Sequence, residues 1–147
     1  MTGLFDLNIE TFLDQWEVFH AIREIIANAL DEQILTGTKD VQIVKEGTIW
    51  HIRDYGRGFQ YKFLTQNENP EKLNREDVIG KFGVGLKDAM AVLYRHGVTI
   101  RIKSKYNVIS TTMAPKEGFS DTITLHANVQ EPSEPNMVGT DVELTNC

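Results

Sequence analysis

The sequence predicts an α+β fold, in which helices cover one face of a mostly antiparallel, mixed sheet in a two-layer sandwich. Two observations predict it. Apolar residues recur at helical spacing early in the chain, and after residue 97 short runs alternate between apolar and polar residues. The 147 residues, of which 41% are hydrophobic, can fill a single core, so we expect one domain over residues 1–147.

The first predicted element is a helix from Asn8 to about Leu35. Its apolar residues fall within one broad stripe when each residue turns by about 100°. These residues are Phe12, Trp16, Phe19, Ile22, Ile26 and Leu30. The run TGTKD that follows supplies a glycine, which predicts the end of the helix.

The remaining elements follow from alternation and from glycine and proline positions. Two alternating runs, residues 41–47 and 48–54, predict an antiparallel hairpin with a turn at Glu46-Gly47. Residues 61–77 are polar and contain Pro70, which indicates a loop. Leu86 begins a second helix, and Gly97 ends it. The alternating runs that predict the later strands are residues 98–105, 107–114, 121–128 and 138–146.

Composition excludes several classes of function. The net charge of −6 argues against direct nucleic-acid binding, because a basic face supplies most of that affinity. No segment is apolar enough to span a bilayer and the N-terminus lacks a secretion signal, so we expect no membrane association. A cytoplasmic location is expected, or a nuclear one in a eukaryote. The single cysteine, Cys147, argues against a disulfide framework.

The first motif that can carry chemistry lies on the long helix. Glu24, Asn28 and Asp31 are spaced i, i+4 and i+7, so they share one stripe opposite the apolar stripe. An acid, an amide and a second acid suit a divalent ion with a positioned water. A solvated helix face is the alternative, but the chain has no lysine before Lys39 to balance these charges.

The second motif is DYGRGF at the end of a predicted strand. Asp54 can accept a hydrogen bond from a ligand amine there, and Gly56 and Gly58 let a ligand approach the backbone. The alternative is a glycine-rich turn that the aspartate caps.

The third motif is GKFGVGLKDAM, which opens the second predicted helix. Its glycines expose backbone N–H groups at a helix start, which favours anion binding, and Lys81 and Lys87 bracket the loop. It lacks the Gly-Lys-Ser/Thr ending of a Walker A loop and does not directly follow a strand, as a Rossmann loop does.

Taken in order, these motifs resemble those of the Bergerat-fold (GHKL) ATPases. This group includes gyrase B subunits, ninety-kilodalton heat-shock chaperones, histidine kinases and MutL, with MORC proteins as relatives. The motif wording is most similar to the chaperone and MORC types. The matching residues are Glu24, Asn28 and Asp31 (E-x-x-x-N-x-x-D), Asp54, Gly56 and Gly58 (D-x-G-x-G), Gly80, Gly83 and Gly85 (G-x-x-G-x-G), Lys87 and Met90 (G-L-K-x-x-M), and a late Gly139-Thr140.

The resemblance implies the Bergerat ATP-binding fold and a role for each matching residue. Glu24 would be the general base that polarises water, and Asn28 would bind Mg²⁺ together with phosphate oxygens and water. Asp31 would face the adenine side. Asp54 would accept the adenine amino group, and Thr140 would support it.

The resemblance also implies a lid that closes over the phosphates, which we expect to be mobile and to lie at about residues 59–85. The residues that would bind the nucleotide here are Gly56, Gly58, Lys81, Gly83, Val84, Gly85 and Lys87. Lys81 stands where relatives often carry glutamine, and a γ-phosphate contact is the role it would take.

The implied function is binding and slow hydrolysis of Mg-ATP, in which lid closure drives dimerisation or binding of a protein partner. Slow turnover is expected because relatives receive a γ-phosphate cation from a following domain that this sequence does not include. Two alternatives remain open: a protein serine kinase of the anti-sigma-factor type, and a non-hydrolysing ATP-binding adapter. We expect His20 to be a capping or surface residue.

Overall fold

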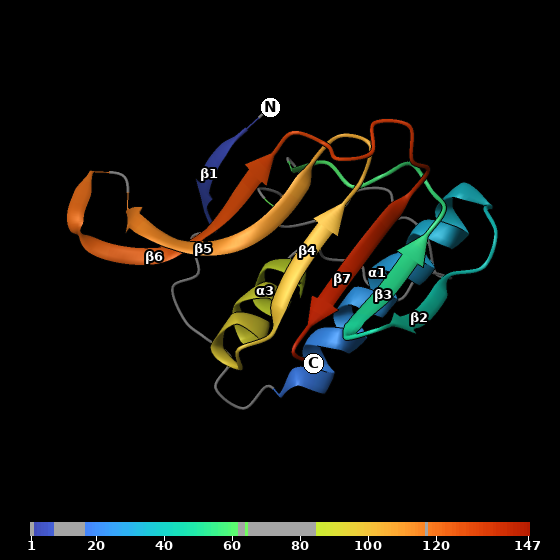
Figure 1. Ribbon diagram of the computed structural model, residues 1–147, viewed down its shortest axis with the longest axis horizontal. Coiled ribbons are helices and arrows are strands. Elements are labelled where there is room, and N and C mark those ends of the chain that lie inside the picture. The colour runs from blue at the N-terminus through green and yellow to red at the C-terminus, as the bar shows by residue number, and fades with distance from the viewer. Residues whose placement is uncertain (1, 8–16, 62–63, 65–84, 117) are drawn as a thin grey trace.

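The computed structural model describes residues 2–7, 17–61, 64, 85–116 and 118–147 (Figure 1). Most of the predicted lid lies outside these residues, as do the predicted phosphate-binding residues Lys81, Gly83 and Val84. No helix among the described residues is both long and apolar enough to cross a membrane.

The described residues form one seven-stranded sheet, in the order β1-β6-β5-β4-β7-β3-β2. The strands are β1 (Gly3–Asp6), β2 (Gln42–Glu46), β3 (Ile49–Asp54), β4 (Thr99–Lys103), β5 (Val108–Lys116), β6 (Phe119–Gln130) and β7 (Thr140–Thr145). All neighbouring strands pair antiparallel. The last strand, β7, lies inside the sheet, between β4 and β3.

The predicted fold class, a two-layer α+β sandwich of the Bergerat type with a mixed sheet, is wrong. The described residues form a β-rich fold with seven antiparallel strands and two helices, α1 (Val18–Thr36) and α3 (Gly85–Arg95). Both helices lie behind the part of the sheet that contains β4, β7 and β3, and the long β5–β6 hairpin extends beyond them (Figure 1). Periodicity predicts where helices and strands occur. The order and register of the strands depend on contacts between residues far apart in the sequence, which periodicity does not reveal.

The predicted C-terminal ends of the two helices are confirmed. α1 ends at Thr36, and Gly37 follows in the left-handed conformation (φ 62°) and donates its N–H to the carbonyl of Gln33. At the other end, His20 Nδ1 accepts the backbone N–H of Glu17 at 2.9 Å, so the predicted capping role is confirmed. The helix begins at Val18, after Glu17 in an extended conformation, so the prediction of one unbroken helix from Asn8 is wrong; residues 8–16 themselves lie outside the described residues.

The predicted apolar stripe of this helix does not match the face that is buried. Phe19 is 61% exposed, whereas Asp31 is 0% exposed. The other buried residues of α1 are Ala21, Ile25, Ala27 and Ala29. Small side chains let α1 pack closely against α3 and β3, and of the stripe of Glu24, Asn28 and Asp31 the last is buried whereas the first two are half-buried.

The later elements agree with their predictions. β2 and β3 form the expected antiparallel hairpin, which turns at Gly47 and Thr48. α3 ends before Gly97, which has φ 76°. The core lies between the sheet and the two helices, where its largest fully buried apolar residues are Ile25, Met90, Leu93, Ile100, Ile102, Ile109 and Leu144.

Candidate functional site

The second and last motifs meet where β3 ends and β7 begins. Asp54 and Thr140 are direct partners in the antiparallel pairing of these strands. Asp54 Oδ1 accepts the backbone N–H of Gly56 at 3.0 Å. Thr140 Oγ1 accepts the N–H of Phe59 at 2.8 Å, and Ser104 Oγ donates to the carbonyl of Phe59 at 2.6 Å. The fold therefore brings together residues that are 86 positions apart.

Glycine is required here because chain segments pass very close to one another. A Cβ on Gly139, which has φ 78°, would lie 2.0 Å from the carbonyl oxygen of Asp54. A Cβ on Gly56 would lie 2.4 Å from Cγ of Glu32. The sequence analysis expected Gly56 to let a ligand approach the backbone. In the structure, the Glu32 side chain of α1 occupies the space beside Gly56.

Asp54 is a buried acid, with only 7% of its surface exposed. Burial raises the pKa of Asp54 from 3.8 to about 6; the N–H of Gly56 opposes the shift, and the nearby charge of Glu32 adds to it. The carboxylate is still mostly charged at pH 7. It retains acceptor capacity, because a carboxylate offers about four lone-pair positions.

Glu32 and Arg57 hold the glycine-rich loop against α1, a pair that the sequence analysis did not predict. Arg57 Nη2 lies 2.8 Å from Glu32 Oε1. The backbone N–H and Nε of Arg57 donate to Glu32 Oε2 at 2.8 and 3.1 Å. The signal available in the sequence was an arginine between the two glycines of D-x-G-x-G and a glutamate next to Asp31.

The other end of α1 meets the third motif. A Cβ on Gly85 would lie 2.4 Å from Glu24 Oε2, so the Glu24 carboxylate lies against the backbone at the start of α3. Eight residues separate Glu24 from Glu32, which places them about 12 Å apart along the helix axis. Asn28 lies between them and is half-buried. α1 therefore runs from the third motif to the second.

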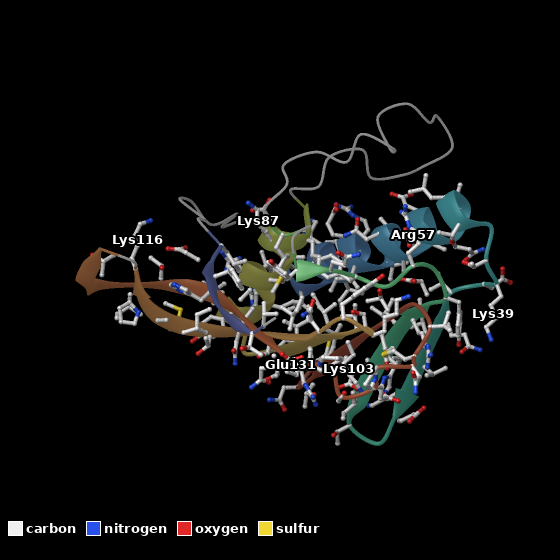
Figure 2. The ribbon with its side chains drawn as sticks, turned by 90° about the horizontal axis from the view of Figure 1, so that it is seen from above. Lys39, Arg57, Lys87, Lys103, Lys116 and Glu131 are labelled. Carbon is white, nitrogen blue, oxygen red and sulfur yellow. The ribbon has the colours of Figure 1, made fainter. Side chains whose placement is uncertain are left out.

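Lys87 lies on α3, two residues after Gly85, and is half-buried. In Figure 2, Lys87 and Arg57 lie on the helix side of the sheet, whereas Lys103 and Glu131 lie on the opposite side. The predicted residue Lys87 is thus on the same side of the sheet as Arg57 of the glycine-rich loop. The contacts above place the other predicted site residues that the structure describes in two groups, one around Asp54 and Thr140 and one around Glu24 and Gly85.

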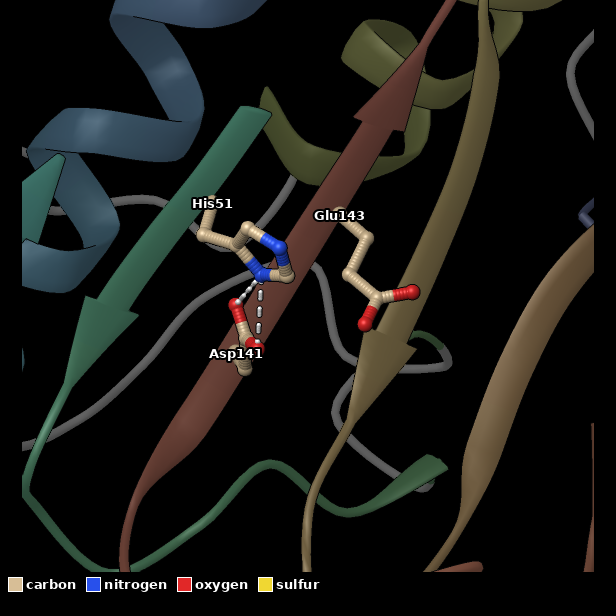
Figure 3. A group of neighbouring side chains, drawn as sticks. All are labelled: His51, Asp141 and Glu143. Carbon is tan, nitrogen blue, oxygen red and sulfur yellow. Dashed lines mark hydrogen bonds and ion pairs between the residues drawn. The ribbon is translucent and has the colours of Figure 1, made fainter. Parts of the chain in front are cut away.

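A separate cluster lies on the open face of the sheet, where Figure 3 shows His51 of β3 beside Asp141 and Glu143 of β7. His51 Nδ1 lies 2.9 and 3.1 Å from the two carboxylate oxygens of Asp141. Each residue offers one potential metal-ligand atom within 4.8 Å of the others. Glu143, however, lies 3.5 Å from both Arg101 Nη1 and Lys103 Nζ. These cations oppose a divalent ion, so the cluster is best described as a charge network.

No family model matches the chain. An uncharacterized protein of Mycoplasma pneumoniae (strain M129) is 43% identical to it over 145 residues. The match covers 95% of this chain and 58% of that relative, so the chain spans less than two thirds of the relative's length. The relative's name assigns no activity, so a functional proposal depends on the motif residues and their geometry.

Proposed function

We propose that the chain binds Mg-ATP and hydrolyses it slowly, and that nucleotide binding drives dimerisation or the binding of a protein partner. The observation that carries the proposal is Asp54, a buried carboxylate with a raised pKa beside Thr140 at a strand end. Strongly perturbed acids of this kind are concentrated at functional sites. The proposal depends on the motif residues and their spatial arrangement and does not assume the Bergerat fold.

In this proposal Asp54 accepts the amino group of adenine, and Thr140 supports the same edge of the base. Asp54 uses backbone groups of Gly56 and Thr140 as its hydrogen-bond partners, and neither neutralises its charge. A ligand amine would compensate a charge that no cation among the described residues pairs with directly, since the charge of Arg53 is the smallest of the influences on the Asp54 pKa. Guanine presents a carbonyl where adenine has the amine, so the site would discriminate against GTP.

The phosphates would extend along α1 toward Glu24 and the start of α3. The axial separation of about 12 Å between Glu32 and Glu24 accommodates an elongated ligand with its base at one end. Glu24 would act as the general base that orients the attacking water. Lys87 and the N–H groups at the start of α3 would bind phosphate, together with Lys81, Gly83 and Val84, which lie outside the described residues.

Asn28 would hold Mg²⁺ through its amide oxygen. The residue fits this role because it is half-buried one turn from Glu24, on the same stripe of α1. Mg²⁺ typically takes one or two protein oxygens and fills its other positions with water and phosphate. When bound, the ion would neutralise phosphate charge.

The proposal is tested by calorimetry with ATP and GTP on the wild-type protein and on Asp54→Asn. We expect ATP to bind more tightly than GTP, and Asp54→Asn to weaken ATP binding by about 1.5–3 kcal/mol, the range for a hydrogen bond to a charged group. Asp40→Asn is the matched control, because Asp40 is an exposed aspartate whose contact is with Gln33. Equal affinities of the wild-type protein for ATP and GTP would contradict the assignment of Asp54.

Turnover of labelled ATP tests the hydrolysis step. We expect slow release of phosphate that does not require a protein substrate. Transfer of the label to an added protein would instead support a serine kinase, and binding with no turnover would support an adapter.

A further inference from the structure

A cavity of about 530 Å³ opens away from the candidate nucleotide site. Three segments line it: Thr38 and Lys39 after α1, Arg53 and Tyr55 at the end of β3, and residues 136–138 before β7. Figure 2 shows Lys39 at the end of the molecule remote from Lys116, and apart from Lys87. We refer to this cavity as the Arg53 pocket.

Two cations converge on one aromatic ring in the Arg53 pocket. Lys39 Nζ lies 4.0 Å from the centroid of the Tyr55 ring, and Cζ of Arg53 lies 5.0 Å from it. Among the described residues, neither cation forms an ion pair with a carboxylate. Glu134 and Asp54 lie within electrostatic reach of Arg53, but the described residues that line the pocket include two cations and no carboxylate, which favours an anionic ligand.

The guanidinium of Arg53 also has unused hydrogen-bonding capacity. Its Nη2 donates to the carbonyl of Val138 at 3.3 Å, but its Nε is buried and has no hydrogen-bond partner among the described atoms. A buried donor without a partner requires an explanation, because such groups are rare in folded proteins. Because Nε has no exposed surface, a ligand in the pocket cannot reach it, and anion binding there would depend on the other guanidinium nitrogens.

The acids near Arg53 already have other partners. Asp141, the residue opposite Arg53 on β7, is bound by His51 Nδ1 at 2.9 Å. Glu134 is bound by Lys103 Nζ at 2.9 Å. The charge of Arg53 lowers the pKa of Glu134, but neither acid forms an ion pair with Arg53 in the part of the chain that the structure describes.

The Arg53 pocket lies on the other side of β3 from the candidate nucleotide site. Side chains alternate along a strand, so Arg53 points to the opposite face from its neighbour Asp54. Asp54 shares its face with Ile52, which belongs to the core beneath the helices. A ligand in the pocket would thus be separate from one that binds Asp54.

We propose that the Arg53 pocket binds a small dianion of the phosphate-monoester class. Two cations match the charge of a phosphate monoester, which is about −1.5 to −2 at pH 7. The planar guanidinium suits phosphate oxygens, and Tyr55, Met137 and Val138 supply apolar surface for the ester group. The pocket is shallow and open to solvent, which suits a small, charged ligand that stays partly hydrated.

The test uses nuclear magnetic resonance titrations of the full chain with inorganic phosphate, phenyl phosphate and acetate at pH 7.5. We expect the two phosphates to bind more tightly than acetate, and phenyl phosphate most tightly. Arg53→Gln should weaken phosphate binding about tenfold or more, and Lys39→Gln should weaken it several-fold, with less risk to folding because Lys39 is exposed.

Lys105→Gln is the matched control, because Lys105 Nζ also lies over a tyrosine, 5.1 Å from the ring centroid of Tyr106, but outside the pocket. It should leave phosphate binding unchanged. The proposal is overturned if no phosphate binds, if acetate binds equally well, or if Lys39→Gln and Lys105→Gln have the same effect.

A competition experiment separates this proposal from that for the nucleotide site. Saturating inorganic phosphate should leave ATP binding to the wild-type protein unchanged, and ATP should not displace phenyl phosphate. Displacement by ATP would overturn the idea of a separate pocket. Failure of ATP to bind at all would overturn the nucleotide proposal and leave this one standing.

Discussion

Asp54 and Glu143 are two carboxylates on adjacent strands, Asp54 on the helix side of the sheet and Glu143 on its open side. They are buried to the same extent but differ in the charged groups around them. Asp54 is 7% exposed and Glu143 is 8% exposed. Glu143 lies 3.5 Å from both Arg101 and Lys103, so two cations accompany it. Asp54 has only backbone donors close to it, and burial raises its pKa to about 6.

The difference separates a structural acid from a candidate functional one. A buried acid with cationic neighbours is compensated within the fold. A buried acid without them costs stability when it is charged, and since one pKa unit corresponds to about 1.4 kcal/mol, Asp54 costs about 3 kcal/mol at pH 7. A cost of this kind is typically retained where function needs the group, so the comparison favours the helix side as the site of chemistry.

The largest effect that this comparison predicts is on catalysis. Glu24→Gln should lower ATP turnover by about 10²–10⁴-fold, the contribution of a positioned general base, while leaving ATP binding nearly unchanged. Glutamine keeps the size of the side chain that lies against Gly85, so the change removes the base without opening a gap.

The control for Glu24→Gln is Glu143→Gln on the open face, compared per folded molecule. We expect it to leave turnover unchanged. A wild-type rate in Glu24→Gln would show that water is activated elsewhere, and an equal loss in both variants would remove the distinction between the two faces.

The second effect concerns stability, and its sign is unusual for an aspartate. The folded protein binds a proton at Asp54 up to pH about 6, whereas the unfolded chain releases it near 3.8. Between these values the folded state holds more protons, so this group makes the free energy of unfolding fall as pH rises. Asp54→Asn should therefore be more stable than wild type at pH 7.5, by up to about 3 kcal/mol, and lose that advantage at pH 3.5.

Urea denaturation of both proteins at the two pH values measures this difference. Asp40→Asn controls for the loss of one negative charge on the surface. If Asp54→Asn is less stable than wild type at pH 7.5, the carboxylate has a stabilising partner and the contrast with Glu143 fails.

Local rules predicted most of the elements. The end of α1 at Gly37, the hairpin of β2 and β3 and the end of α3 before Gly97 follow from glycine positions and alternation, which act within a few residues. Strand β1 (Gly3–Asp6) was missed, because four residues carry too little periodicity to detect. Its existence depends on pairing with β6, more than 100 residues away.

The site was predictable as a set of residues but not as an arrangement. Motif spacing selected Asp54 and Thr140, but only strand pairing makes them neighbours. The inward position of Asp31 was mispredicted, because the amphipathic rule assumes that polar residues face solvent. Contacts such as Glu32 with Arg57, or His51 with Asp141, join residues 25 and 90 positions apart, and no local pattern encodes them.

The smallest effects concern the open face itself, where Lys103 contacts two acids of different exposure. Its Nζ lies 2.9 Å from Glu134, whose side chain is 58% exposed, and 3.5 Å from Glu143, whose side chain is 10% exposed. If burial rather than distance sets the strength of these ion pairs, the longer pair, Lys103 with Glu143, should contribute more to the free energy of unfolding. Glu143→Gln removes the acid that Arg101 contacts and leaves Lys103 with Glu134 alone, so it should cost about 1–3 kcal/mol of unfolding free energy.

Glu134→Gln should cost less than about 1 kcal/mol, because solvent screens an exposed pair. The hydrogen bond from Lys103 lowers the pKa of Glu134, so the small stabilisation should be present above pH 4.5 and be lost as the pH falls below that value. Thermal denaturation of the two variants at pH 7, with and without 0.5 M salt, compares them directly. A larger loss in Glu134→Gln than in Glu143→Gln would mean that distance outweighs burial on this face, and the compensation of Glu143 would then need another explanation.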